Sequence, residues 1–106
     1  MLKGNGKKII MTEGDYGLSL PITINGATFE PNDNIKLVIK RVANGEEVLS
    51  KTYSDIENNT FEFILTEEES KLLTPFDYVY TLDWFRNGNF LCNIIKDGAF
   101  QVEDKY

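Results

Sequence analysis

The chain contains no histidine and a single cysteine, Cys92, in 106 residues. The lack of histidine excludes Ser-His and Cys-His catalytic pairs, together with every zinc site that uses a histidine ligand. With one cysteine, no disulfide can form within the chain and no cysteine cluster can hold a metal. We therefore expect a protein with no enzyme activity, no cofactor and no bound metal.

Long hydrophobic runs are missing as well. No stretch approaches the roughly 18 consecutive apolar residues that a membrane-spanning helix needs. The apolar run from Ile9 to Met11 is too short for the core of a signal peptide. We expect a chain that is made in the bacterial cytoplasm, carries no export signal and has no membrane partner.

Positive charge is scarce. Eleven Lys and Arg stand against seventeen Asp and Glu, so the formal net charge is -6. Binding to nucleic acid requires a basic face that neutralises phosphates, and this balance disfavours it. A hydrophobic share of 42% and a charged share of 26% are typical of a folded domain. We expect residues 1–106 to form one domain, in which residues 1–6 are a loose N-terminus.

What the sequence does contain is apolar residues that alternate with polar ones, the pattern of a half-buried strand. The dipeptides Asn44-Gly45 and Asn87-Gly88 are typical of type I′ hairpins, and Asp97-Gly98 indicates a further turn. About eight short strands result, which favours an all-β sandwich or a barrel. The predicted strands are 7–13, 18–24, 35–40, 48–53, 61–65, 78–85, 90–96 and 99–103.

One short helix interrupts the strands. Thr66 is a favourable N-cap, and Glu69 follows it by three residues, which is the spacing of a capping box. Pro75 prevents the helix from continuing. We expect about two turns of helix, with Leu72 and Leu73 facing the core.

Tyr78 follows Leu73 and Pro75 and begins the most β-prone segment of the chain, 78–85. This order resembles the tyrosine corner of immunoglobulin-like sandwiches, in which the tyrosine hydroxyl bonds to backbone a few residues upstream. We therefore expect an all-β, immunoglobulin-like antiparallel β-sandwich of about eight short strands, with one short helix before the Tyr78 strand.

Pairing Arg86 with Asn89 across the Asn87-Gly88 turn, and continuing through a second hairpin at Asp97-Gly98, divides the last strands into two faces. One face is predicted to be core and contains Tyr78, Tyr80, Leu82, Trp84, Leu91, Ile95, Phe100 and Val102. The other face is too apolar for a solvated sheet and contains Val79, Phe85, Phe90, Cys92 and Ile94. Our hypothesis is that a partner subunit covers this second face. The alternatives are cover by a loop or by the N-terminal segment, or a β-bulge that shifts the register.

The acidic groups have structural explanations. The glutamates at 67–69 complement the dipole of the helix N-terminus and do not require an acid-base role. Asp15, Asp33 and Asp77 are candidate oxygen ligands for Ca²⁺, but no segment has the spacing of an EF-hand loop. Asp15 follows Gly14 and Asp33 follows Asn32, so both are interpreted as turn residues.

The aromatic residues and the thiol also have structural explanations. Trp84, Tyr78, Tyr80 and Phe85 could form a sugar-binding platform, but alternating aromatic residues on a strand are more typical of a core. Cys92 is predicted to lie in mid-strand without a histidine partner, which indicates an inert thiol. A stand-alone carbohydrate-binding or adhesion module is kept as the alternative function, and we expect no small-molecule ligand.

Three segments of the chain share features with one known family. The first, MTEGDYGLSLPITINGATFEPNDNIKLVIK, has a Gly14-Asp15 turn, an alternating strand, a turn at 31–33 and another strand. The second, KLLTPFDYVYTLDW, has a Leu followed by a Tyr-x-Tyr strand entry. The third, IIKDGAFQVED, closes with Gly98, Phe100 and Val102. Together they resemble the N-terminal immunoglobulin-like domain of phage baseplate upper proteins and related tail proteins.

The resemblance covers residues 9–103 and departs from the family at Asn32 and Phe76, where glycine is usual. It implies a structural building block or adaptor of a phage or prophage tail or baseplate, present in the virion. Its implied contacts are with other copies of itself, as a homo-oligomer, and with neighbouring tail or baseplate proteins. It implies no catalytic residue.

Overall fold

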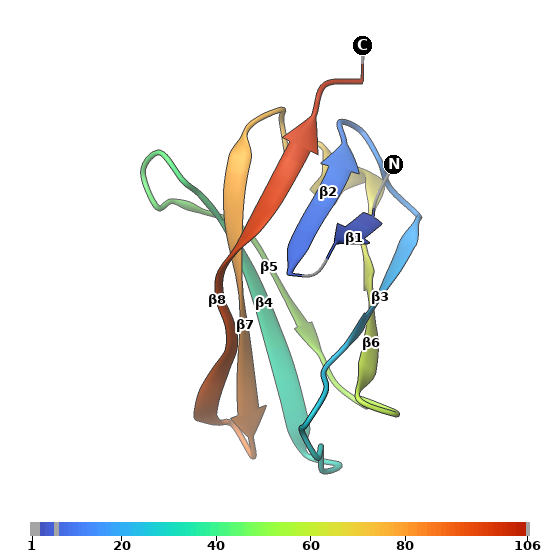
Figure 1. The fold of residues 1–106 in the computed structure, drawn as a ribbon, viewed down its shortest axis with the longest axis vertical. Helices are drawn as coiled ribbons and strands as arrows, with labels where there is room; N and C mark the ends of the chain where they lie inside the picture. Colours follow the sequence, from blue (N-terminus) through green and yellow to red (C-terminus); the bar gives the residue numbers. More distant parts are fainter. Residues whose placement is uncertain (1–2, 6, 106) are drawn as a thin grey trace.

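The computed structural model describes residues 3–5 and 7–105, which form eight strands and one turn of helix (Figure 1). The strands are β1 Lys3–Asn5, β2 Lys8–Thr12, β3 Ser19–Thr23, β4 Asp33–Arg41, β5 Glu47–Tyr53, β6 Thr60–Ile64, β7 Asp77–Arg86 and β8 Asn89–Glu103. The helix α1 spans Glu67–Ser70.

Two sheets make up the molecule. The large sheet has the strand order β1-β2-β8-β7-β4-β5, and the small sheet pairs β3 with β6. Figure 1 shows the small sheet on the right of the large one, with both chain ends at the top. The predicted all-β sandwich is confirmed. It departs from a purely antiparallel arrangement at one pair, because β2 runs parallel to β8 with Ile9 opposite Phe100.

The core lies between the two sheets. Strand β4 alternates as the sequence predicts and buries Ile35, Leu37 and Ile39 on its inner side. Phe61 and Phe63 face them from β6 in the small sheet. Tyr78, Tyr80, Leu82, Phe100 and Val102, all predicted as core, are buried. Trp84 and Ile95 are half-buried, whereas Leu91 is exposed, so the predicted core face is correct only in part.

The hairpin predicted at Asp97-Gly98 is wrong. Residues 89–103 form one continuous strand, in which Asp97 adopts a left-handed φ of 54° and Gly98 stays in the ladder opposite Tyr80. A Cβ on Gly98 would lie 2.7 Å from Cε1 of Tyr80. This glycine therefore lets the strand pass the tyrosine ring closely and does not form a turn.

The two Asn-Gly turns differ from each other. Asn87 and Gly88 both have positive φ, 52° and 80°, which confirms the predicted type I′ hairpin. At Asn44-Gly45 only the glycine has a positive φ, of 70°. The Gly45 N–H donates to the Arg41 carbonyl. That connection is a longer turn, so the type I′ prediction is wrong there.

The capping box is present, since Thr66 and Glu69 exchange side-chain and backbone hydrogen bonds. The helix itself is one turn long, shorter than predicted. Beyond its end, Leu73 is buried as predicted, whereas Leu72 is exposed. At the N-terminus, Lys3–Asn5 pair with β2 as strand β1 within the segment that was expected to be loose. The remainder of that segment, residues 1, 2 and 6, lies outside the described residues.

Candidate interaction surface

The predicted interface residues Val79, Phe85, Phe90, Cys92 and Ile94 do not share one face. The first pairs of the β7–β8 hairpin match the prediction, with Arg86 opposite Asn89 and Phe85 opposite Phe90. The register then shifts between Trp84 and Phe85, and again on either side of Leu82. Each extra residue in β8 reverses the alternation of the β8 side chains that follow it, relative to their partners in β7. The β-bulge alternative is the one that the structure supports.

The bulges separate the five residues. Cys92 lies opposite Trp84 and is exposed, instead of lying opposite Asp83. Ile94 is half-buried and packs against the core. Val79 lies opposite Ala99, toward the other end of the ladder, and is half-buried. Only Phe85 and Phe90 remain together from the predicted set.

Phe85 and Phe90 contact each other edge to face, with ring centroids 5.8 Å apart. Phe90 is 55% exposed, and the next residue, Leu91, is 44% exposed. Cys92 adds a third exposed side chain in succession. We name Phe85 and Phe90 the hairpin surface, and Leu91 and Cys92 follow it along β8 beyond the first register shift. It presents apolar side chains to solvent near the tip of a strand pair, at the lower end of the molecule in Figure 1.

A polar cluster fixes the base of this hairpin. Asp33, only 1% exposed, accepts hydrogen bonds from Arg86 Nε at 2.8 Å, from Arg86 Nη2 at 3.1 Å and from Trp84 Nε1 at 3.0 Å. It also accepts from the Glu30 N–H in its own turn. The Asn87 N–H donates to the Asn32 carbonyl, so the hairpin turn is joined to the turn that precedes β4. This turn role of Asp33 was predicted, but its partners in β7 were not.

The cluster is also electrostatically matched. The hydrogen bond from Arg86 holds the pKa of the Asp33 carboxyl well below its usual range, against the opposing effect of burial. The Arg86 guanidinium also lies over the Trp84 ring, 5.5 Å from its centroid, and Trp84 contacts Phe29. Trp84 therefore serves packing and hydrogen bonding.

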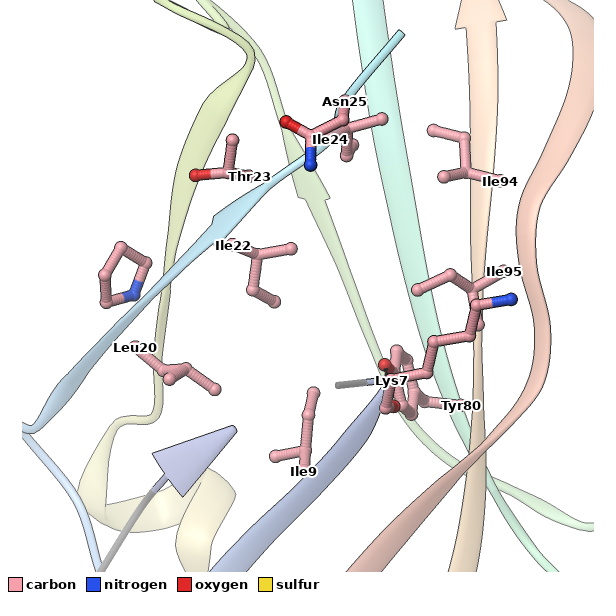
Figure 2. A pocket seen from close by; sticks show the side chains of 11 residues that line it. Lys7, Ile9, Leu20, Ile22, Thr23, Ile24, Asn25, Tyr80, Ile94 and Ile95 are labelled. Carbon is pink, nitrogen blue, oxygen red and sulfur yellow. Dashed lines mark hydrogen bonds between the residues drawn. The ribbon is translucent and has the colours of Figure 1, made fainter. Parts of the chain in front are cut away.

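A groove of about 400 Å³ lies between β3 and β8 (Figure 2). Its aliphatic lining comes from three strands and comprises Ile9, Leu20, Ile22, Ile24, Ile94 and Ile95. The sequence does not predict this groove, because the groove depends on the bulge that turns Ile94 inward. Lys7 is the one charged residue among the described residues that line it.

The other singled-out groups have structural roles. The Tyr78 hydroxyl donates to the Thr74 carbonyl at 3.0 Å, four residues upstream, which is the bond expected of a tyrosine corner. Asp15 accepts from the Thr12 N–H in its turn. Within residues 3–5 and 7–105, no three His, Cys, Asp or Glu gather as a metal site would require. No helix of that part of the chain is long and apolar enough to span a membrane.

Comparison with known proteins gives no match: no protein-family model, no curated protein and no solved structure is similar to this chain.

Proposed function

We propose that the chain is a non-enzymatic structural protein of a phage or prophage tail or baseplate, and that it acts through protein–protein contacts. The observation that carries the proposal is the hairpin surface, where Phe85 and Phe90 contact each other on a supported strand pair and Phe90 is largely exposed to solvent. Large exposed apolar side chains that lie together mark contact sites more often than solvated surface. The assignment to a phage, and the description of the sandwich as immunoglobulin-like, rest on the sequence resemblance.

The support beneath the hairpin favours a contact role over a flexible tip. Four hydrogen bonds converge on the Asp33 carboxylate, and three of them come from Trp84 and Arg86 of β7. A surface that is already ordered loses less conformational entropy when a partner binds. The hairpin surface is therefore suited to contacts between copies of the chain, which is how a tail ring or baseplate is built.

The proposal is tested in virions. Particles are purified from an induced culture of the strain that encodes the chain, and their proteins are identified by mass spectrometry after removal of soluble protein. We expect this chain to co-purify with tail proteins at a fixed ratio. Its absence from particles that contain the other tail proteins would overturn the phage assignment.

A further inference from the structure

The groove between β3 and β8 is walled on one side by the edge of a strand. Residues 20–25 line it consecutively, so the backbone of β3 reaches the groove as well as its side chains. Strand β3 pairs with β6 and with no other strand in the described part of the chain. Figure 2 shows Leu20 and Ile22 of β3 on one side of the groove and Ile94 and Ile95 of β8 on the other.

The pairing pattern identifies the backbone groups at this edge. In an antiparallel ladder, hydrogen-bonded pairs alternate with pairs that are not hydrogen-bonded. The Ile24 N–H donates to the Asn59 carbonyl at 2.8 Å, so Ile24 and Ile22 direct their backbone groups toward β6. Thr23 and Pro21 lie between them in the alternation and direct theirs toward the groove.

Pro21 limits the backbone hydrogen bonds that a further strand could form at the groove edge of β3. Proline has no N–H, so the donor from β3 that borders the groove between Ser19 and Thr23 is missing. Thr23 keeps both its N–H and its carbonyl. The open edge can therefore bind a short segment centred near Thr23, while Pro21 opposes indefinite sheet extension.

The opposite wall sets the chemistry of the side chains that would enter. Ile94 and Ile95 of β8 are half-buried and border the groove together with Ile9. A strand laid beside β3 would direct every second side chain toward these residues, because strand side chains alternate between faces. Lys7, exposed at the groove, is complementary to a carboxylate in a chain whose overall charge is -6.

We propose that this groove binds an extended segment of a partner protein, which adds to the edge of β3 at Thr23, covers Ile94 and Ile95 with alternate aliphatic side chains, and places a carboxylate against Lys7. Strand addition of this kind combines backbone hydrogen bonds with side-chain pockets. A fatty acyl chain would cover the same isoleucines but would form no hydrogen bond with the Thr23 N–H. The inference goes beyond the proposed phage role and does not depend on it.

The test uses the full chain and a labelled synthetic peptide, Glu-Ile-Thr-Ile-Thr-Val-Ser. A permuted peptide, Glu-Thr-Thr-Ser-Ile-Ile-Val, keeps the composition without the alternation, and a third peptide carries backbone N-methyl groups at both threonines. We expect the first peptide to bind in fluorescence anisotropy and both others to bind at least about tenfold more weakly. Amide hydrogen exchange at Thr23 should slow on binding.

Variants locate the site. Ile94→Glu should weaken binding at least about tenfold, whereas Leu91→Glu, an exposed position on the same strand, should not. Lys7→Glu changes an exposed side chain and should weaken binding, and a peptide with Lys in place of Glu should restore it. Equal binding of the permuted or N-methylated peptide would overturn the proposal. So would no peptide binding at millimolar concentration, or binding of sodium dodecanoate alone with unchanged exchange at Thr23.

Discussion

Arg86 reaches from the end of β7 to Asp33 at the start of β4, and its Nε lies 2.8 Å from Asp33 Oδ1. Two residues that are 53 positions apart in sequence thus join the β7–β8 hairpin to the turn before β4. Arg86 also approaches Glu30 at 3.1 Å, on the same turn. This relationship makes the hairpin a supported element, and the proposed contact surface depends on it.

Asp33→Asn should lower the free energy of unfolding by about 2 kcal/mol, because it removes a charged acceptor of several hydrogen bonds. Its lowered pKa also makes a prediction about pH. A carboxyl whose pKa is depressed on folding stabilises the protein above its unfolded pKa of about 3.9, and this contribution is lost as the pH falls further. In urea denaturation, the free energy of unfolding of the wild type should therefore fall below about pH 4, and the difference between wild type and Asp33→Asn should shrink there.

Asp55→Asn is the control for this prediction. Asp55 is exposed, and asparagine tolerates its positive φ of 54°. Glu69 also has a lowered pKa: burial raises it, but hydrogen bonds from Lys51 and Thr66 outweigh that effect. The Glu69 contribution is common to all three proteins and cancels in the comparison. A constant difference between wild type and Asp33→Asn from pH 7 to pH 2 would contradict the role given to Asp33.

Two tyrosine-to-phenylalanine changes should have opposite effects. Tyr78→Phe removes the hydrogen bond to the Thr74 carbonyl and should cost about 1 kcal/mol of stability. The Tyr53 hydroxyl is buried without a hydrogen-bond partner among the described residues, and burial raises its pKa. Tyr53→Phe should therefore be neutral or stabilising by up to about 1 kcal/mol. Thermal and urea unfolding of both variants measure this, and equal losses in the two would refute it.

Gly98→Ala should destabilise the fold by about 2 kcal/mol through overpacking. The added Cβ would lie within 3.0 Å of the Tyr80 ring and of the Ile95 side chain. Displacing Tyr80 would also disturb its hydroxyl, which donates to the Lys7 carbonyl. Ala99→Ser, at the exposed neighbouring position, is the control and should change stability little. A Gly98→Ala protein as stable as wild type in urea would show that the close approach at Tyr80 is not required.

The local features of this fold could be predicted from the sequence. Alternation in β4, the capping box at Thr66 and the Asn87-Gly88 hairpin each depend on residues that are close in the chain, and each was predicted. A bulge in β8 was only one of several alternatives, because the position of a bulge is set by how β8 packs against β7 and the core. A single extra residue moves Ile94 to the inner side of the sheet, so the predicted interface lost most of its members.

Contacts between residues far apart in the chain could not be predicted from the sequence either. Asp33 has the pattern of a turn aspartate, and nothing local indicates that Trp84 and Arg86 bind it. The parallel pairing of β2 with β8 joins the two ends of the chain and likewise has no local signal. Both features become visible only when the order of strands in the sheet is known.

The most direct test of the central claim is light scattering on a sizing column over a wide range of protein concentrations. The account predicts that the wild type self-associates as concentration rises, and that Phe90→Ser shifts the protein to monomer with little change in stability. Phe76→Ser is the matched control, because Phe76 is 63% exposed at the opposite end of β7. It should associate as the wild type does. A wild type that is monomeric at every concentration, or a Phe90→Ser protein that associates unchanged, would contradict the claim that the hairpin surface joins copies of this chain.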